Sequence, residues 1–308
     1  MKNQIKIFCS ENWSFDSAQD KTSYALLDTG EGEKLEKFGP YIFIRPYEDA
    51  IWPKTLSSKE WGKADGKFWS SKTGAKSGWK MSRGILDTKS KWEMEYRGIK
   101  FLVSPTPFRH LGFFPEQASH WDFIETRLRQ GFDGQKKIKF LNLFGYTGVA
   151  SLFALRAGAE VTHLDASKQT LNWAKENQKL NAELAEAPMR IIEDDVIKFL
   201  EREEKRGNKY DAVIMDPPKF GRGPKGEIWK IEEMLPKLLS QVQKILSDRP
   251  LFIILTSYAT DSSSLSLGHA LSEMMRDFNG KIKAGELCVL EKSNNRVIPL
   301  ANTAVWTS

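Results

Sequence analysis

Four short segments of the chain place glycines, carboxylates or prolines directly at the end of an apolar run. They are LNLFGYTG at 141–148, HLDAS at 163–167, EDDV at 193–196 and MDPPKF at 215–220. Glycines permit a tight turn and a close approach of ligand to backbone, and carboxylates accept hydrogen bonds from hydroxyl or amino groups. These residue types predict a site for a polar organic ligand, provided that the fold brings the four segments together.

The glycine turn and the proline segment narrow the kind of ligand. Gly145 and Gly148 form G-x-x-G, whereas sites for a dinucleotide pyrophosphate usually show G-x-G-x-x-G, so a small polar ligand tail fits better. In Asp216–Phe220 the two prolines remove backbone donors, which would leave the carbonyls free to face a substrate. Phe220 could stack on a flat ring. The alternative is that D-P-P only ends a strand.

The two acidic segments suggest contacts to hydroxyl and amino groups. Asp165 is placed to accept hydrogen bonds from two vicinal hydroxyls of a ribose, while Ser167 caps the helix that follows. In EDDV, Asp195 could accept from an adenine amino group, and the N–H of Val196 could reach a ring nitrogen. We favour Asp195 over Asp194, whose charge could simply stabilise the helix N-terminus.

The elements that must position these segments alternate between strand and helix from about residue 134 to residue 308. Strand-like runs such as KIKFLNLF (137–144) and YDAVIMD (210–216) are each followed by an amphipathic helical run or a loop that leads to one. Such alternation predicts a doubly wound α/β fold, a parallel sheet with helices on both faces. Ligands bind such sheets beyond the carboxyl ends of the strands, so we expect all four segments at one edge.

The remainder of the chain is predicted to form a β-rich N-terminal module over residues 1–90 and a linking segment over 91–133. The module is a possible place for substrate or RNA recognition. In the linking segment, KWEMEYRGIKFLVSP (91–105) predicts a hairpin around Arg97 and Gly98. The domain that carries the four segments covers residues 134–308.

A basic stretch from Lys54 to Lys100 suggests an anionic partner. It holds twelve Lys or Arg against five acids, a surplus of seven in a chain whose net charge is +6. Cations interleaved with aromatic side chains suit phosphate contacts and base stacking. The alternative is a solvated lysine-rich face whose tryptophans pack inward. The tryptophans are Trp52, Trp61, Trp69, Trp79 and Trp92.

Composition excludes several other classes of protein. No run approaches the roughly 20 apolar residues of a membrane span, and the first residues lack the apolar core of a signal peptide, so we expect a cytoplasmic protein without membrane contact. The two cysteines, Cys9 and Cys288, show no metal or redox spacing. The four histidines do not pair with acids at metal spacing, so no metal site is expected. They are His110, His120, His163 and His269.

The four segments, in this order, resemble the class I S-adenosylmethionine-dependent methyltransferases. The match is closer to the bacterial family related to the large-subunit ribosomal RNA methyltransferases that carry a DPPKF loop, and it covers the chain from about Trp92 to the C-terminus. The resemblance implies a Rossmann-like seven-stranded doubly wound sheet, S-adenosylmethionine as cofactor and RNA, most simply ribosomal RNA, as substrate. The alternatives are a protein or small-molecule methyltransferase and a non-catalytic RNA-binding protein that retains the fold.

The resemblance also implies roles for individual residues. The segment FRHLGFFPEQ (108–117) is similar to the family's segment that helps to cover the cofactor. The candidate cofactor contacts are Phe114, Gln117, Phe144, Gly145, Tyr146, Thr147, Gly148, Asp165, Ala166, Asp195 and Val196. Phe114 and Gln117 come from the segment 108–117. The loop Phe144–Gly148 would hold the methionine part of the cofactor. Asp165 and Ala166 would contact the ribose, and Asp195 and Val196 would contact the adenine. The candidate catalytic loop is Asp216, Pro217, Pro218, Lys219 and Phe220.

The chemistry of the target atom is constrained by where the cysteines lie. Methylation of cytosine C5 proceeds through attack by a cysteine thiolate, and neither DPPKFGRG nor LTSYATDSSS (255–264) contains a cysteine. A nitrogen needs no covalent step, because a carboxylate or carbonyl can orient its lone pair. The sequence therefore favours a nitrogen over cytosine C5. Lys219 stands where nitrogen methyltransferases with a (Asp/Asn)-Pro-Pro loop carry an aromatic residue.

Overall fold

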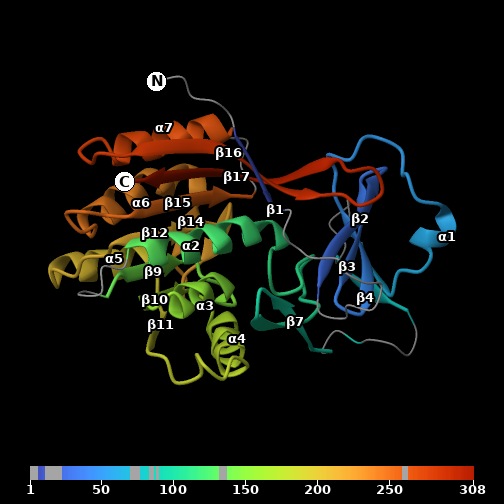
Figure 1. Cartoon of the computed structure of the whole chain (residues 1–308), viewed down its shortest axis with the longest axis horizontal. Coiled ribbons are helices and arrows are strands. Elements are labelled where there is room, and N and C mark those ends of the chain that lie inside the picture. The colour runs from blue at the N-terminus through green and yellow to red at the C-terminus, as the bar shows by residue number, and fades with distance from the viewer. Residues whose placement is uncertain are drawn as a thin grey trace. The chain divides into compact units, whose positions relative to one another are not determined.

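The protein is described by a computed structural model in which two compact units are present (Figure 1). The α/β unit contains residues 6–8, 119–287 and 300–308, and the β unit contains residues 9–118 and 288–299. The tip of the C-terminal hairpin thus belongs to the β unit. The structure describes residues 6–10, 23–69, 77–82, 87, 90–131, 137–258 and 263–308.

An eight-stranded sheet forms the centre of the α/β unit. Its order is β1-β16-β17-β15-β12-β9-β10-β11. The strands are β1 (Lys6–Ser10), β9 (Lys139–Leu143), β10 (Glu160–Asp165), β11 (Met189–Glu193), β12 (Ala212–Met215), β15 (Phe252–Ser257), β16 (Lys281–Leu290) and β17 (Val297–Thr307). Strands β9, β10, β11, β12 and β15 run parallel, and β17 is antiparallel to β15. The doubly wound α/β prediction is confirmed, and β1 adds an eighth strand at the edge beside β16.

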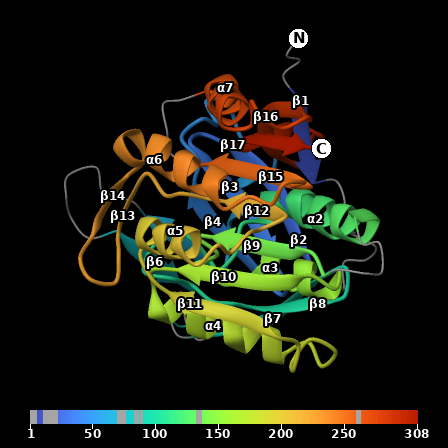
Figure 2. The same ribbon diagram turned by 90° about the vertical axis from the view of Figure 1, so that its left-hand side faces the viewer.

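Helices cover both faces of this sheet, as Figure 2 shows. One row comprises α2 (Ala118–Gly131), α3 (Val149–Arg156) and α4 (Lys168–Lys179). The other row comprises α5 (Val196–Lys205), α6 (Ile231–Lys244) and α7 (Ser264–Met274). Because each of α3, α4 and α5 directly follows a parallel strand, their N-termini lie at the carboxyl edge of the sheet.

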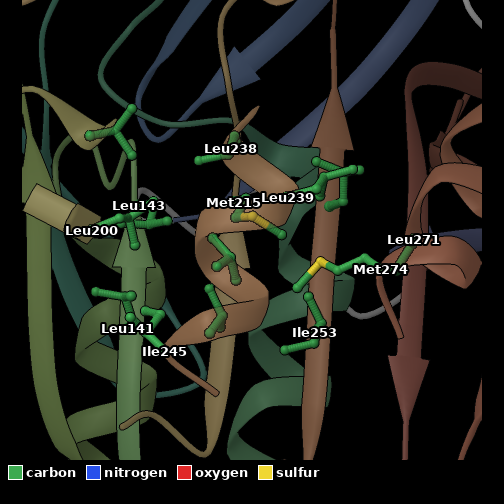
Figure 3. Packing of buried hydrophobic residues seen from close by; sticks show 14 of the residues in the cluster. Leu141, Leu143, Leu200, Met215, Leu238, Leu239, Ile245, Ile253, Leu271 and Met274 are labelled. Carbon is green, nitrogen blue, oxygen red and sulfur yellow. The ribbon is translucent and has the colours of Figure 1, made fainter. Parts of the chain in front are cut away.

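The core between the sheet and the second row of helices is built from aliphatic side chains at alternate strand positions. Leu141 and Leu143 of β9 point to the same face and pack beside Met215 and Ile253 under α5, α6 and α7 (Figure 3). Asn142, between the two leucines, points to the other face, where its Nδ2 donates to Ser151 Oγ of α3 at 3.0 Å. This buried packing, at about 1.5–3 kcal/mol for each fully buried aliphatic side chain, holds the strand ends in place.

The β unit is organised around a five-stranded sheet and a separate hairpin. The sheet consists of β2 (Tyr24–Gly30), β3 (Glu33–Phe38), β4 (Tyr41–Pro46), β5 (Gly66–Trp69) and β6 (Gly78–Met81), and α1 spans Ser58–Trp61. The hairpin β7 (Trp92–Tyr96) and β8 (Ile99–Val103) confirms the expected turn at Arg97 and Gly98, both of which have positive φ. In the described residues, no helix is both long and apolar enough to cross a membrane.

Candidate functional site

The loop after β9, Phe144–Gly148, has an unusual backbone that is held by its neighbours. Phe144 and Tyr146 adopt left-handed conformations with φ of 59° and 52°. Each such residue costs on the order of 1–3 kcal/mol unless the surroundings impose it. Here the Gly145 N–H donates to the Leu164 carbonyl at 2.9 Å and the Tyr146 N–H donates to Asp165 Oδ2 at 2.9 Å. Strained backbone of this kind is concentrated at functional sites.

Gly145 is required because the imidazole of His163 lies against its α-carbon. A Cβ at this position would stand 2.3 Å from His163 Cε1 and 2.4 Å from His163 Nδ1. His163 is fully buried on β10, and its Nδ1 lies 3.0 Å from Ser151 Oγ. Burial lowers the pKa of His163 to about 4, so the ring is neutral at pH 7. Its position fixes how closely the loop approaches the sheet.

Asp165, at the end of β10, organises the turn into α4. Its Oδ2 accepts from the Tyr146 N–H, and its Oδ1 accepts from the Ser167 N–H at 2.9 Å and from Thr170 Oγ1 at 3.0 Å. Ser167 is the N-cap of α4, as expected, and its hydroxyl accepts from the Thr170 N–H. The half-buried carboxylate therefore ties the β9 loop to the end of β10, and among the described residues only the Tyr146 N–H donates to its Oδ2, which leaves one lone pair of that oxygen for a ligand.

Asp195 and Asp194, at the end of β11, both contact the start of α5. Asp195 is the N-cap of α5, because its Oδ1 accepts from the Lys198 N–H at 3.0 Å. Asp194 pairs with Arg202, its Oδ1 accepts from the Asp195 N–H at 2.9 Å, and its own N–H donates to the Asp165 carbonyl at 3.2 Å. Oδ2 of Asp195 makes no hydrogen bond to any residue that the structure describes.

The loop after β12, Asp216–Phe220, differs from the expectation in its carbonyl groups. The Pro218 carbonyl accepts from Trp229 Nε1 at 2.6 Å, and the Lys219 carbonyl accepts from the Ile231 N–H at 3.1 Å. The expectation of free carbonyl groups is therefore wrong for Pro218 and Lys219, because the segment that contains Trp229 and Ile231 returns to the loop and donates to both. The side chains of Lys219 and Phe220 are exposed, and Pro217 is buried.

Trp229 was not identified from the sequence as part of the site. It lies on β14 (Ile228–Lys230), which pairs with β13 (Phe220–Arg222) in an antiparallel hairpin. Its ring is 5% exposed and meets the Phe144 ring edge-on at 5.0 Å. One side chain thus contacts both the loop after β9 and the loop after β12. No local sequence pattern indicates these contacts, because Ile228 and Trp229 are both apolar although only Trp229 is buried.

Phe114 and Gln117 belong to the β unit. Phe114 precedes a 3-10 turn, Pro115–Gln117, and its ring lies 4.8 Å from the His110 ring. Gln117 is buried. The cofactor contacts inferred for these two residues stay predictions, whereas the remaining candidate residues all lie in the α/β unit at the ends of β9, β10, β11 and β12.

The basic stretch from Lys54 to Lys100 lies partly outside the described residues, at 70–76, 83–86 and 88–89. Most of its tryptophans pack within the β unit, as the inward-packing alternative expects. Their indole N–H groups donate to Thr29 from Trp52, to Asp28 from Trp61, to Thr106 from Trp79 and to Phe38 from Trp92. Trp69 is 44% exposed. Four of the five tryptophans that were predicted to stack on nucleic-acid bases therefore donate hydrogen bonds within the β unit instead.

Comparison with known proteins assigns the family. A model of the S-adenosylmethionine-dependent methyltransferases matches residues 106–248. The crystal structure of the SAM-dependent methyltransferase from Agrobacterium tumefaciens is 38% identical, covers 98% of this chain and 93% of that chain, and superposes with a TM-score of 0.88. The chain belongs to the S-adenosylmethionine-dependent methyltransferases. The family expected from the sequence is confirmed, and so is S-adenosylmethionine as the cofactor of that family.

Curated relatives of this methyltransferase match over part of their length. The ribosomal RNA large subunit methyltransferase I of Aeromonas salmonicida is 32% identical over 149 residues, which is 47% of this chain and 36% of the relative. The ribosomal RNA large subunit methyltransferase K of Neisseria meningitidis is 33% identical over 152 residues, 49% of this chain and 41% of the relative. The chain thus spans well under half the length of these relatives. Among the described residues, no cluster of three His, Cys, Asp or Glu could hold a metal ion.

Proposed function

We propose that this methyltransferase transfers the methyl group of S-adenosylmethionine to RNA, with ribosomal RNA as the first candidate. The curated relatives that support this substrate are ribosomal RNA methyltransferases by name. The chain also carries a net charge of +6, which suits a polyanionic substrate. A protein or small-molecule substrate is the outcome that the experiment below must distinguish.

One observation carries the proposal: the ends of four parallel strands are joined into a single site by direct contacts. Tyr146 and Asp165 join the β9 loop to β10, and the Asp194 N–H and the Asp165 carbonyl join β11 to β10. Trp229 joins the β9 loop, through Phe144, to the loop after β12. The loop proposed to hold the cofactor and the loop proposed to hold the substrate are therefore neighbours within one compact unit, and alignment of a methyl donor with an acceptor needs such proximity.

The residues present fit S-adenosylmethionine. The Gly145 position, which a Cβ would fill, lets the loop Phe144–Gly148 hold the methionine part. Asp165 Oδ2, together with the backbone of Ala166, would accept the ribose hydroxyls. The cofactor contacts inferred for Phe114 and Gln117 from the family resemblance stay predictions.

The adenine position has its own support. Oδ2 of Asp195 is available to accept from the adenine amino group. Val196 is the first residue of α5, where backbone N–H groups have no partner within the helix, so its N–H could reach a ring nitrogen. A carboxylate acceptor beside an N–H donor matches the edge of adenine. Both groups lie at the end of β11, beside Asp165 of β10, which is the proposed ribose contact.

The chemistry needs positioning more than acid–base catalysis. S-adenosylmethionine supplies a methyl carbon on a positively charged sulfur, which is open to in-line attack. The role of Asp216 would be to accept a hydrogen bond from the substrate's amino group, and that of Phe220 to stack on the base. The contacts of Pro218 and Lys219 with Trp229 and Ile231 would keep the loop from moving away.

The proposed target atom is a nitrogen rather than cytosine C5. A thiolate that attacks a base must be accessible, and Cys288 is 1% exposed on β16. The segments that form the site, from residue 141 to residue 223, contain no cysteine. A nitrogen with its own lone pair requires no such group.

The test is nucleoside mass spectrometry of ribosomal RNA from cells that lack this protein. The proposal expects one methylated nucleoside to be missing, to return with the wild-type chain, and to stay missing with Asp216→Ala or Asp165→Ala. A missing N-methyl nucleoside would support the nitrogen assignment, and a missing 5-methylcytidine would overturn it. An unchanged nucleoside profile would overturn the RNA assignment and point to a protein or small-molecule substrate.

A further inference from the structure

The hairpin that follows the substrate loop consists of β13 and β14 (Figure 2), and its two faces differ in burial. Its cross-strand pairs are Phe220 with Lys230, Gly221 with Trp229 and Arg222 with Ile228. Because side chains alternate along a strand, Trp229 points inward with Gly221, and the other four residues share the outer face.

The outer face of the hairpin carries large apolar side chains that are exposed to solvent. Phe220 and Ile228 are each 57% exposed, and they are two of only six exposed large hydrophobic side chains in the described part of the chain. The hairpin is anchored from its inner face, through Trp229 against Phe144 and the Pro218 carbonyl. Large apolar side chains that lie together and are exposed to solvent indicate a surface that contacts another molecule.

The same hairpin carries an excess of positive charge. From residue 219 to residue 230 there are four cations, Lys219, Arg222, Lys225 and Lys230, against the single acid Glu227. Glu227 pairs with Lys198, which lowers the pKa of Glu227 to about 2, and its Oε2 accepts from the backbone N–H of Lys225 at 2.9 Å. Among the described residues, no side-chain cation of the hairpin forms an ion pair with it. Lys230 forms an exposed pair with Glu233 at 2.8 Å, and such pairs are worth little. No acid of the described chain pairs with Arg222.

Aromatic and cationic side chains stand at a useful spacing on this face. Phe220 and Arg222 are two residues apart on β13, about 7 Å along the strand. Lys230 lies directly opposite Phe220, within about 5.5 Å of it. A base stacked on Phe220 would therefore have its flanking phosphates within reach of two long cationic side chains. This combination is typical of surfaces that bind single-stranded nucleic acid.

We propose that the outer face of the β13–β14 hairpin binds the target nucleotide together with the single-stranded RNA next to it. Phe220 stacks on the target base, Ile228 contacts the face of a neighbouring base, and Arg222 and Lys230 contact the flanking phosphates. The proposal rests on the RNA substrate proposed above and names the surface that recognises it. An acidic protein segment is the competing partner, and the exposed ring of Phe220 favours RNA because every base offers a face to stack on.

The test measures binding of the full chain to a labelled single-stranded RNA of mixed sequence as a function of salt. For single strands, the logarithm of affinity falls with that of salt by about 0.7 per phosphate contact. The double variant Arg222→Gln/Lys230→Gln should therefore reduce the salt slope by about 1.4. Phe220→Ala should weaken binding by about 5- to 150-fold, the range for loss of one stacked base.

The matched control removes the same charge elsewhere. Lys179→Gln/Lys205→Gln alters exposed lysines at the last residues of α4 and α5, at the opposite edge of the sheet, and should leave the slope unchanged apart from a small general effect. Binding of S-adenosylhomocysteine by calorimetry should be the same in both double variants, which shows that each is folded.

Three outcomes would overturn the hairpin assignment. If both double variants change the slope equally, the effect is one of net charge. If the hairpin variants bind RNA with the affinity and salt slope of wild type, the hairpin is not the RNA-binding surface. If wild type still binds RNA and the methylated nucleoside is still missing from cells that lack the protein, the proposed RNA methylation is unaffected by that result. If the hairpin variants lose binding to polyglutamate but keep binding to RNA, the partner is an acidic protein segment.

Discussion

The close contact between Gly145 and His163 makes a quantitative prediction about the cofactor loop. In Gly145→Ala the new methyl group would lie 2.3 Å from His163 Cε1, whereas carbon atoms in contact stay about 3.5–4.0 Å apart. The overlap exceeds about 1 Å, and neither partner moves easily because His163 is fully buried on a central strand. Such overpacking costs about 1–3 kcal/mol in the free energy of unfolding, and it displaces the loop from its left-handed geometry.

The assay is a double-mutant cycle measured by urea unfolding and by calorimetry with S-adenosylhomocysteine. Gly145→Ala should lower both stability and affinity. His163→Ala destabilises the chain by itself, but it removes the atoms that the new methyl group would meet. Gly145→Ala should therefore cost much less in the His163→Ala background, with a coupling energy of about 0.5–3 kcal/mol.

The control is Gly78→Ala, where a Cβ would come no closer than 3.8 Å to Trp69, so stability should change little. If Gly145→Ala costs the same with and without His163, the contact does not determine the loop. If Gly145→Ala leaves cofactor affinity unchanged, the loop does not hold the cofactor as proposed.

Three further predictions concern pH, the substrate loop and the adenine position. The folded-state pKa of His163, about 4, lies below the unfolded value of about 6.5, so the unfolded chain binds more protons between these values. Stability should therefore fall as pH drops from 6.5 towards 4, by about 1.4 kcal/mol at pH 5.5 for this histidine, and urea unfolding of His163→Asn should lack that part of the slope. Trp229→Phe keeps the ring against Phe144 but removes the N–H that reaches the Pro218 carbonyl, so methyl transfer should slow about five-fold while calorimetry shows unchanged cofactor affinity. Asp195→Ala should lose about 1 kcal/mol of stability with the helix cap, whereas Asp195→Ser should retain the cap and still bind S-adenosylhomocysteine more weakly.

Each of these predictions has a clear contrary result. A His163→Asn variant with the wild-type pH slope would assign the acid sensitivity to other groups, such as His120, whose pKa burial lowers to about 3. Wild-type turnover in Trp229→Phe would remove the tryptophan from the positioning of the loop. Equal cofactor affinity in Asp195→Ser and wild type would show that this carboxylate does not contact the adenine.

The features predicted correctly from the sequence are those set by local pattern. Apolar runs followed by amphipathic runs predicted the strands and helices after residue 134, and a polar residue before an amphipathic run predicted the Ser167 cap. The four strand-end segments could be placed at one edge because parallel strands have their carboxyl ends together.

The features that were missed depend on partners far away in the chain. The sequence of strand β3, EKLEKF, is mostly charged, so a buried strand was not expected there. Glu36 of this strand can be buried because a residue of β4 pairs with it. Arg45 donates to both carboxylate oxygens of Glu36, at 2.6 and 2.7 Å. Strand β1 joins the sheet beside β16, far along the chain. Trp229 matters because of Phe144, and nothing near Trp229 in the sequence indicates that contact.

The central claim is that S-adenosylmethionine binds at the ends of β9, β10 and β11, with Asp165 on the ribose. The most direct measurement is calorimetric titration of wild type and Asp165→Ala with S-adenosylhomocysteine, with thermal unfolding to show that both are folded. The account predicts saturable one-to-one binding by wild type and a marked loss of affinity in the folded variant. Absence of saturable binding by wild type, or equal affinity in the variant, would contradict it.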